Sequence, residues 1–181
     1  RYDDEALLYY AGLFAQRPPA AVSLEMIVAD YFAVPAAVRQ FQGQWLILSP
    51  EDRSLLPTPR DLRGQNNQLG GNVVIGERVW DVQSKFRVRL GPLDYAQFRQ
   101  FVPNGKSLPT LGQLVRTYAG PQWDFDVQPV LRAAQVPWCR LGGDGRDPSR
   151  LGWNTWVRNR PLKRDADDAV FKETQRVMGD R

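Results

Sequence analysis

The feature that most constrains the fold is an alternation of side-chain types from Gly76 to Leu90, GERVWDVQSKFRVRL. From Trp80 onward every second side chain is apolar, with Ser84 as the exception, and the positions between them are polar or charged. Successive side chains of a β-strand point to opposite faces, so the alternation predicts one strand with an apolar face and a basic face. The apolar set is Trp80, Val82, Phe86, Val88 and Leu90, and the cations of the basic set are Lys85, Arg87 and Arg89.

Two expectations follow from these faces. Trp80 and Phe86 should lie in the core, where truncation to alanine costs about 3 to 5 kcal/mol. The cations should lie on the outer surface, where a substitution usually costs less than ~0.5 kcal/mol. Serine at all three basic positions is therefore expected to leave the fold intact and to weaken only a contact made by this face.

The remaining patterns predict helices in pairs between strands. Apolar residues at helical spacing predict a helix over residues 3–16, a second helix capped by Ser23, and two more that begin near Pro92 and at Ser107. The predicted buried stripes of the last three helices are Leu24, Ile27, Val28 and Tyr31; Leu93, Phe98, Phe101 and Val102; and Leu111, Leu114, Val115 and Tyr118. Strands are predicted over residues 37–48, 78–90 and 123–133, with a further hairpin from 139–141 and 151–157. This order predicts an α+β fold, a mostly antiparallel sheet packed with helical hairpins, with one long extended loop. We expect one domain over residues 1–158, followed by a charged tail over 159–181 that forms one short helix.

The long loop runs from Ser49 to Asn72 and mixes prolines and glycines with leucines. Loops longer than ~12 to 15 residues are usually functional or disordered. One interpretation is that Leu55 and Leu56 fold back onto the domain. The other is a docking loop, stiffened by prolines and weakly ordered around residues 57–67 in the isolated chain. The candidate contact residues are Leu55, Leu56, Pro57, Pro59, Leu62, Asn66 and Asn67.

The absence of histidine excludes several kinds of catalytic site. The chain has no histidine, so Ser-His-Asp, Cys-His and histidine-bearing zinc sites cannot form within it. Neither a P-loop nor a G-x-G-x-x-G motif is present. An enzyme with this sequence would need carboxylates, lysine or a bound cofactor, so a carboxylate-dependent hydrolase that uses Asp124 and Asp126 stays an alternative. We predict no cofactor and no bound metal.

Three other groups have simple structural interpretations. The acidic residues at 165, 167 and 168 lack the spacing of a calcium loop and suit the first turn of a helix. On the strand predicted over 123–133, the inward residues are Phe125, Val127 and Leu131, and the outward ones are Asp126, Gln128 and Arg132. Asp124 and Asp126 share one side of this strand, but nearby cations can neutralise them. The GGDG segment at 142–145 predicts a turn. Cys139 is the single cysteine and is predicted to be a small core residue of an unexported, soluble protein.

The basic strand face leaves alternatives open. The sequence pI is about 9.5, which suits nucleic-acid binding, yet the net charge is only +4. The face is either solvated, docked on an acidic protein partner, or a nucleic-acid-binding surface. Composition does not choose among these possibilities.

A set of segments in order resembles one protein family. GERVWDVQSKFRVRLGPL is preceded by YYAGLFAQRP, YFAVP and NNQLG, and is followed by DFDVQPVLRAAQVPWCRLGGD and RLGWNTW. From about Tyr9 to Asp168 these segments resemble the C-terminal half of the TssG family, also called ImpH or VasB, a baseplate subunit of the bacterial type VI secretion system.

The resemblance implies a structural role without catalysis. Members of this family build a baseplate wedge with two copies of TssF, near TssE and TssK, at the cytoplasmic side of the inner membrane. It implies that the long loop engages TssK, and that the face of Lys85, Arg87 and Arg89 docks protein. No nucleic acid and no membrane insertion are expected.

Overall fold

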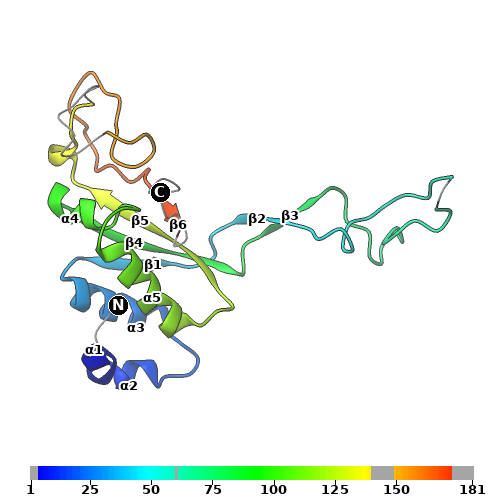
Figure 1. Ribbon diagram of the computed structural model, residues 1–181, viewed down its shortest axis with the longest axis horizontal. Coiled ribbons are helices and arrows are strands. Elements are labelled where there is room, and N and C mark those ends of the chain that lie inside the picture. Colours follow the sequence, from blue (N-terminus) through cyan, green and yellow to red (C-terminus); the bar gives the residue numbers. More distant parts are fainter. Residues whose placement is uncertain (1–3, 60, 140–148, 173–181) are drawn as a thin grey trace, which may run out of the picture. The chain divides into compact units, whose positions relative to one another are not determined.

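The computed structural model describes residues 4–59, 61–139 and 149–172. It divides the chain into two compact units (Figure 1). Unit 1 comprises Arg1–Gln40 and Phe86–Arg181, and unit 2 comprises Phe41–Lys85. The α+β class with a mostly antiparallel sheet is confirmed, because three strand pairs in the two sheets are antiparallel.

The N-terminal part of unit 1 is helical. Its helices are α1 (Asp4–Tyr9), α2 (Ala11–Phe14) and α3 (Ala21–Phe32). The single helix predicted over residues 3–16 is wrong, because the chain turns at Tyr10. The buried Tyr10 side chain donates a 2.5 Å hydrogen bond to Asp30 of α3. Burial and this bond raise the pKa of the Tyr10 hydroxyl, so it stays a neutral donor.

Helix α3 has the predicted buried stripe but a different N-terminus. Leu24, Ile27 and Val28 are buried, whereas Tyr31, the fourth residue predicted for the stripe, is only partly buried. Ser23 is not the cap; it lies inside α3 and donates a 2.9 Å hydrogen bond to Gln16. A tertiary contact holds the helix start instead, because the Tyr118 hydroxyl bonds both the N–H and the carbonyl of Ala20.

The sheet of unit 1 has the order β1-β4-β5-β6. Its strands are β1 (Ala36–Arg39), β4 (Lys85–Leu93), β5 (Asp124–Leu131) and β6 (Phe171–Lys172). Phe86 stacks on Phe125, and farther along both strands a side chain at Gly91 would meet the Val130 carbonyl. Residue numbers rise in the same direction along both strands from the first contact to the second, so β4 and β5 are parallel. The helices between them therefore form a crossover connection.

Two helices make that connection, α4 (Tyr95–Gln100) and α5 (Ser107–Ala119). The prediction that Pro92 begins a helix is wrong: β4 continues to Leu93, and Asp94 caps α4 in a capping box with Gln97. Helix α5 begins at Ser107 as predicted. The core residues predicted for both helices are confirmed as buried: Leu93, Phe98, Phe101, Val102, Leu111, Leu114, Val115 and Tyr118.

Unit 2 contains a two-stranded antiparallel ribbon of β2 (Gln44–Ile47) and β3 (Arg78–Asp81). The strands predicted over residues 37–48 and 78–90 are therefore each two strands in different sheets. The strand predicted over residues 78–90 is broken by a tight turn, in which the Asp81 carboxylate accepts hydrogen bonds from Gln83 N, Ser84 N and the Ser84 hydroxyl. The Ser84 bond is the main cause that lowers the pKa of Asp81, so the acceptor stays ionised.

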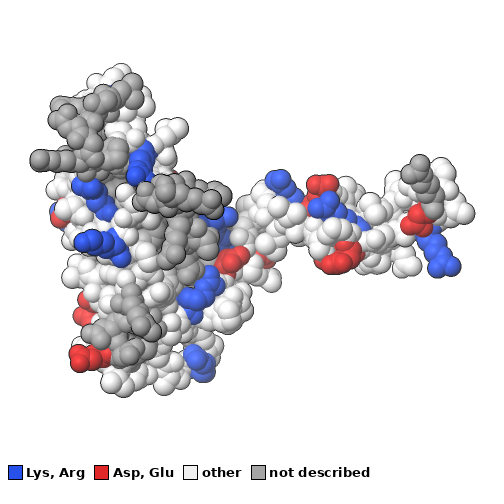
Figure 2. All heavy atoms as spheres, in the orientation of Figure 1, with Lys and Arg blue, Asp and Glu red and all other residues white. Residues whose placement is uncertain are grey.

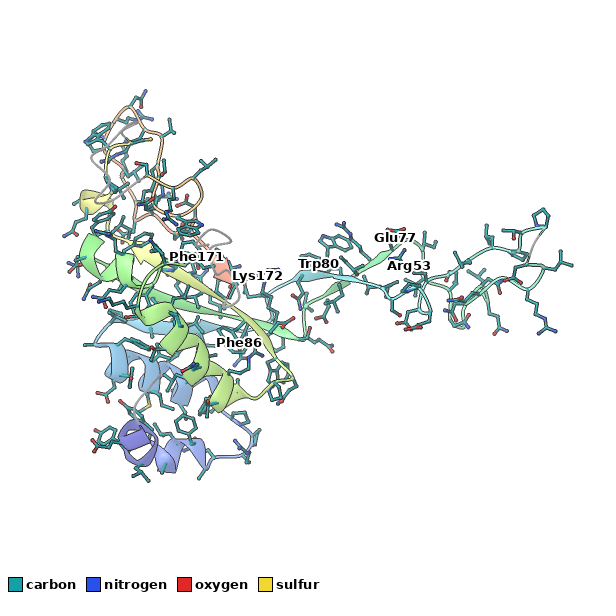
Figure 3. All side chains as sticks on the ribbon, in the orientation of Figure 1. Arg53, Glu77, Trp80, Phe86, Phe171 and Lys172 are labelled. Carbon is teal, nitrogen blue, oxygen red and sulfur yellow. The ribbon has the colours of Figure 1, made fainter. Side chains whose placement is uncertain are left out.

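This break overturns the prediction for Trp80. Trp80 is 53% exposed and pairs edge-to-face with Trp45 at a ring distance of 5.2 Å, directly across the ribbon. A Cβ atom at Gly43 would overlap the Trp80 ring, so Gly43 leaves room for the indole. Trp80 belongs to unit 2, whereas Phe86 packs partly buried against the core of unit 1 (Figure 3).

We expect Trp80→Ala to change the free energy of unfolding of unit 1 by less than ~0.5 kcal/mol, because the side chain contributes nothing to that core. Urea unfolding, with hydrogen exchange in α5 as the probe, measures this change. A loss as large as that of a core truncation would contradict the separation of Trp80 from the core.

The C-terminal part also departs from the sequence predictions. Cys139 is exposed and is not a core residue. Residues 151–157 form no strand, and no helix begins at the acidic residues 165–168, because the described part of the tail, residues 159–172, contains β6. The rest of the tail, in which a short helix was predicted, lies outside the described residues. Phe171 is buried, so this stretch of the predicted charged tail packs on the sheet. The predicted GGDG turn lies outside the described residues.

Candidate functional site

The structure places the predicted basic residues on β4 but does not leave them as an open cationic row. Arg87 makes two hydrogen bonds to Asp126 of β5, Nε to Oδ1 at 2.5 Å and Nη2 to Oδ2 at 2.9 Å. Asp126 is only 1% exposed. The bond to Asp126 raises the pKa of the Arg87 guanidinium, so Arg87 stays charged. This bidentate pair occupies Arg87 within the sheet.

Arg89 and Lys85 are also engaged. Arg89 Nη2 lies 3.6 Å from the Asp167 carboxylate, and the Arg89 side chain is 31% exposed. Lys85 also has interactions within the described residues, and its carbonyl accepts a 2.9 Å hydrogen bond from Gln42. The cations of this face are therefore half-buried and engaged within the chain, and Asp167, the partner of Arg89, belongs to the segment that pairs with the other edge of β5.

The two carboxylates on β5 do not form a catalytic pair. Asp124 is exposed, whereas Asp126 is buried with Arg87. Gln128 was predicted to point outward with Asp126 but is also buried, and it donates a hydrogen bond to the Asp167 carbonyl. The sequence reasoning missed these two residues as internal partners. A usable signal was present, since carboxyl and amide groups alternate on β5 as the cations do on β4.

The long loop of unit 2 contains a small hairpin. Leu55 and Gln65 exchange backbone hydrogen bonds of 2.8 and 2.9 Å, and Thr58 and Asp61 exchange bonds of 2.7 and 3.0 Å nearer the tip. We call residues 55–65 the tip hairpin. Its backbone is paired across both bridges, so this stretch has regular contacts where the sequence predicted weak order.

Amide side chains hold the tip hairpin at its base. Gln65 donates to the carbonyls of Pro50 and Glu51 at 2.9 and 2.7 Å, and Asn66 donates to the Glu51 carbonyl at 2.8 Å. Asn67 donates to the Arg63 carbonyl at 3.0 Å. The amides of Asn66 and Asn67, predicted as partner contacts, thus bond the loop itself. Arg53 and Glu77, which form a 3.1 Å ion pair, join the start of the loop to the residue before β3 (Figure 3).

The leucines of this loop are exposed. The exposed fraction is 54% for Leu55, 80% for Leu56 and 82% for Leu62, so the interpretation that Leu55 and Leu56 fold back onto the domain is not supported. Pro57 and Pro59 lie between them and are exposed as well. Together with Leu69 and Ile75, these side chains give unit 2 an unusually apolar surface.

Unit 2 is electrically balanced. Residues 41–85 contain five Lys or Arg and five Asp or Glu, a net charge of zero, so the +4 of the chain comes entirely from the rest of the sequence. Figure 2 shows the part that contains β2 and β3 as mostly uncharged, with a few positive and negative side chains interspersed. Such a surface suits an apolar partner better than a phosphate backbone.

The described residues contain no group of three or more His, Cys, Asp or Glu side chains placed to hold a metal ion. The acidic residues at 165, 167 and 168 each contact a different partner. In the described part of the chain, no helix is both long and apolar enough to cross a membrane.

Comparison with known proteins gives one family and two similar structures. The family model described as "Type VI secretion, TssG" matches residues 1–158. A cryo-electron microscopy structure of the type VI secretion system TssK-TssF-TssG baseplate subcomplex contains a chain that is 18% identical, with a TM-score of 0.69, over 96% of this chain and 71% of that one. A chain in the baseplate complex from the type VI secretion system is also 18% identical, with a TM-score of 0.56, over 97% of this chain and 50% of that one. No curated protein matches.

Proposed function

Because the chain belongs to the TssG family of type VI secretion proteins, we propose that it is a structural subunit of the type VI secretion baseplate. The observation that carries the proposal is the family match over residues 1–158. Both similar structures are of baseplate assemblies, which supports the same role. In this role the protein holds other subunits together and catalyses no reaction.

The proposed partners are TssF and TssK, which are named together with TssG in the first similar structure. We extend the proposal to TssE and to a wedge with two copies of TssF, at the cytoplasmic side of the inner membrane, as the family resemblance implies. Co-purification of the full-length protein with each partner tests this assignment. Failure to retain TssF or TssK at physiological salt would contradict it.

Within this role, we assign TssK docking to the tip hairpin. Its backbone pairing limits the entropy lost on binding, and its exposed leucines offer apolar area to a partner. The zero net charge of unit 2 favours an apolar groove on TssK as the receptor. Leu55, Leu56, Pro57, Pro59 and Leu62 are the proposed contacts; Asn66 and Asn67 support the hairpin from its base.

We expect the double substitution Leu56→Ser and Leu62→Ser to reduce TssK co-purification at least tenfold, because burying one leucine contributes roughly 1.5 to 3 kcal/mol. Retention of TssF should not change. Leu69→Ser, at a more exposed leucine outside the tip hairpin, is the matched control. TssK bound in wild-type amounts by the double variant would place the docking contact elsewhere.

The structure gives less support for docking through the basic face of β4 than for docking through the tip hairpin. Arg87 and Arg89 each contact a carboxylate of the same unit, so a partner would have to compete with those carboxylates. Direct docking through Lys85, Arg87 and Arg89 remains a prediction. The same contacts disfavour the nucleic-acid alternative, since a phosphate would meet the same competition.

A further inference from the structure

Asp165, Asp167 and Asp168, near the end of the described chain, each contact a different partner. Asp165 accepts a 2.9 Å hydrogen bond from the N–H of Ala133. Asp167 lies 3.6 Å from Arg89 of β4, and Asp168 accepts a 2.9 Å hydrogen bond from the indole N–H of Trp156. Three carboxylates close together in sequence therefore attach one segment to three separate parts of unit 1.

The backbone of the same segment pairs with β5 at two places. Leu131 and Ala166 exchange backbone hydrogen bonds of 2.9 and 2.8 Å. Farther along, Phe171 and Lys172 form β6 and pair antiparallel with Val127 and Asp126 of β5 (Figure 3). Between these two pairings, the Gln128 side chain donates to the Asp167 carbonyl. The segment therefore follows the free edge of β5 along most of its length.

The segment also contributes to the core. Phe171 is 1% exposed, and Ala166 and Ala169 are buried with it. The ring of Trp153 lies edge-on to that of Phe171 at 6.5 Å. Burying a phenylalanine side chain contributes roughly 1.5 to 3 kcal/mol, so the segment has an apolar contact besides its polar ones.

Polar groups of the sheet lie next to the segment. Asp126 and Gln128 are buried on β5, and Arg87 of β4 pairs with Asp126. In the described part of the chain, Arg89 Nε and Gln128 Oε1 are buried without a hydrogen-bond partner. The segment contacts this group at two points: the Asp167 carboxylate lies near Arg89, and the Asp167 carbonyl accepts the hydrogen bond from Gln128.

We propose that the edge of β5 is a strand-accepting edge and that residues 165–172 occupy it in the same molecule as a clasp. An unpaired β-edge invites another strand, and the clasp occupies it with backbone pairing, three carboxylate contacts and one buried ring. The family match ends at residue 158, so this role lies beyond the family assignment.

Hydrogen exchange on the full chain tests the clasp. The amides of residues 166–172 should be protected in the monomer. Ala166→Pro removes the N–H that bonds Leu131 and should speed exchange across residues 166–172 by roughly tenfold or more, leaving α3 unchanged. Arg164→Pro is the matched control, because Arg164 is exposed and lies before the paired stretch.

A milder variant covers the case in which Ala166→Pro unfolds the whole unit. Asp167→Asn with Asp168→Asn should speed exchange selectively in residues 166–172. Unprotected amides in the wild-type monomer, or no selective change in either variant, would overturn the proposal. Protection seen only in a dimer would also overturn it, since the edge of β5 would then be occupied by a second copy through strand exchange.

Discussion

Arg87→Met is expected to destabilise unit 1 by about 3 kcal/mol or more, measured as the free energy of unfolding in urea. The substitution removes the bidentate partner of Asp126, a carboxylate that is 1% exposed. Breaking a buried ion pair from one side typically costs roughly 3 to 5 kcal/mol, because the remaining charge keeps its desolvation penalty. This expectation replaces the one drawn from the sequence, in which serine at this position left the fold intact.

Two further variants separate the ion pair from general packing. Arg89→Met should cost less than ~1 kcal/mol, because its partner Asp167 has a side chain that is 56% exposed. Adding Asp126→Leu to Arg87→Met should recover part of the loss, since an apolar pair leaves no buried charge. Equal stability of Arg87→Met and wild type would show that the Asp126 carboxylate does not need the guanidinium.

Phe98→Ala is expected to cost about 3 to 5 kcal/mol in the free energy of unfolding of unit 1. Phe98 is fully buried on α4, and its ring lies 5.6 Å from that of Trp156. Truncation therefore leaves a cavity at the contact between α4 and the C-terminal part of the chain, in addition to the lost burial of the ring.

Trp80→Ala supplies the comparison for Phe98→Ala, because it removes an even larger ring from the other unit. Both variants are measured by urea unfolding under the same conditions. A loss below ~1 kcal/mol for Phe98→Ala would mean that the core collapses around the missing ring or that α4 is not part of the cooperative unit.

Local patterns determined most of the helices and the inward side chains. The buried stripes of α3 and α5 follow from helical spacing, and Phe125, Val127 and Leu131 are buried as the alternation on β5 predicted. These features depend on periods of two or 3.6 residues, which any short window of sequence contains. The long loop over residues 49–72 could also be predicted from the sequence, since its length and its leucines can be read from it directly.

Only the tertiary structure decided what covers each face and edge. The alternation from Gly76 to Leu90 is continuous in sequence, yet the turn at Asp81 and Ser84 sends its halves to different sheets. The sequence predicts Asp126 and Gln128 as outward, because nothing nearby in it shows that Arg87 pairs with Asp126 or that residues 165–172 return to pair with β5 and bond Gln128. Strand pairing joins residues some forty positions apart, and its free energy depends on the partner that is present. The period of a strand therefore specifies two faces, but not which of them meets water.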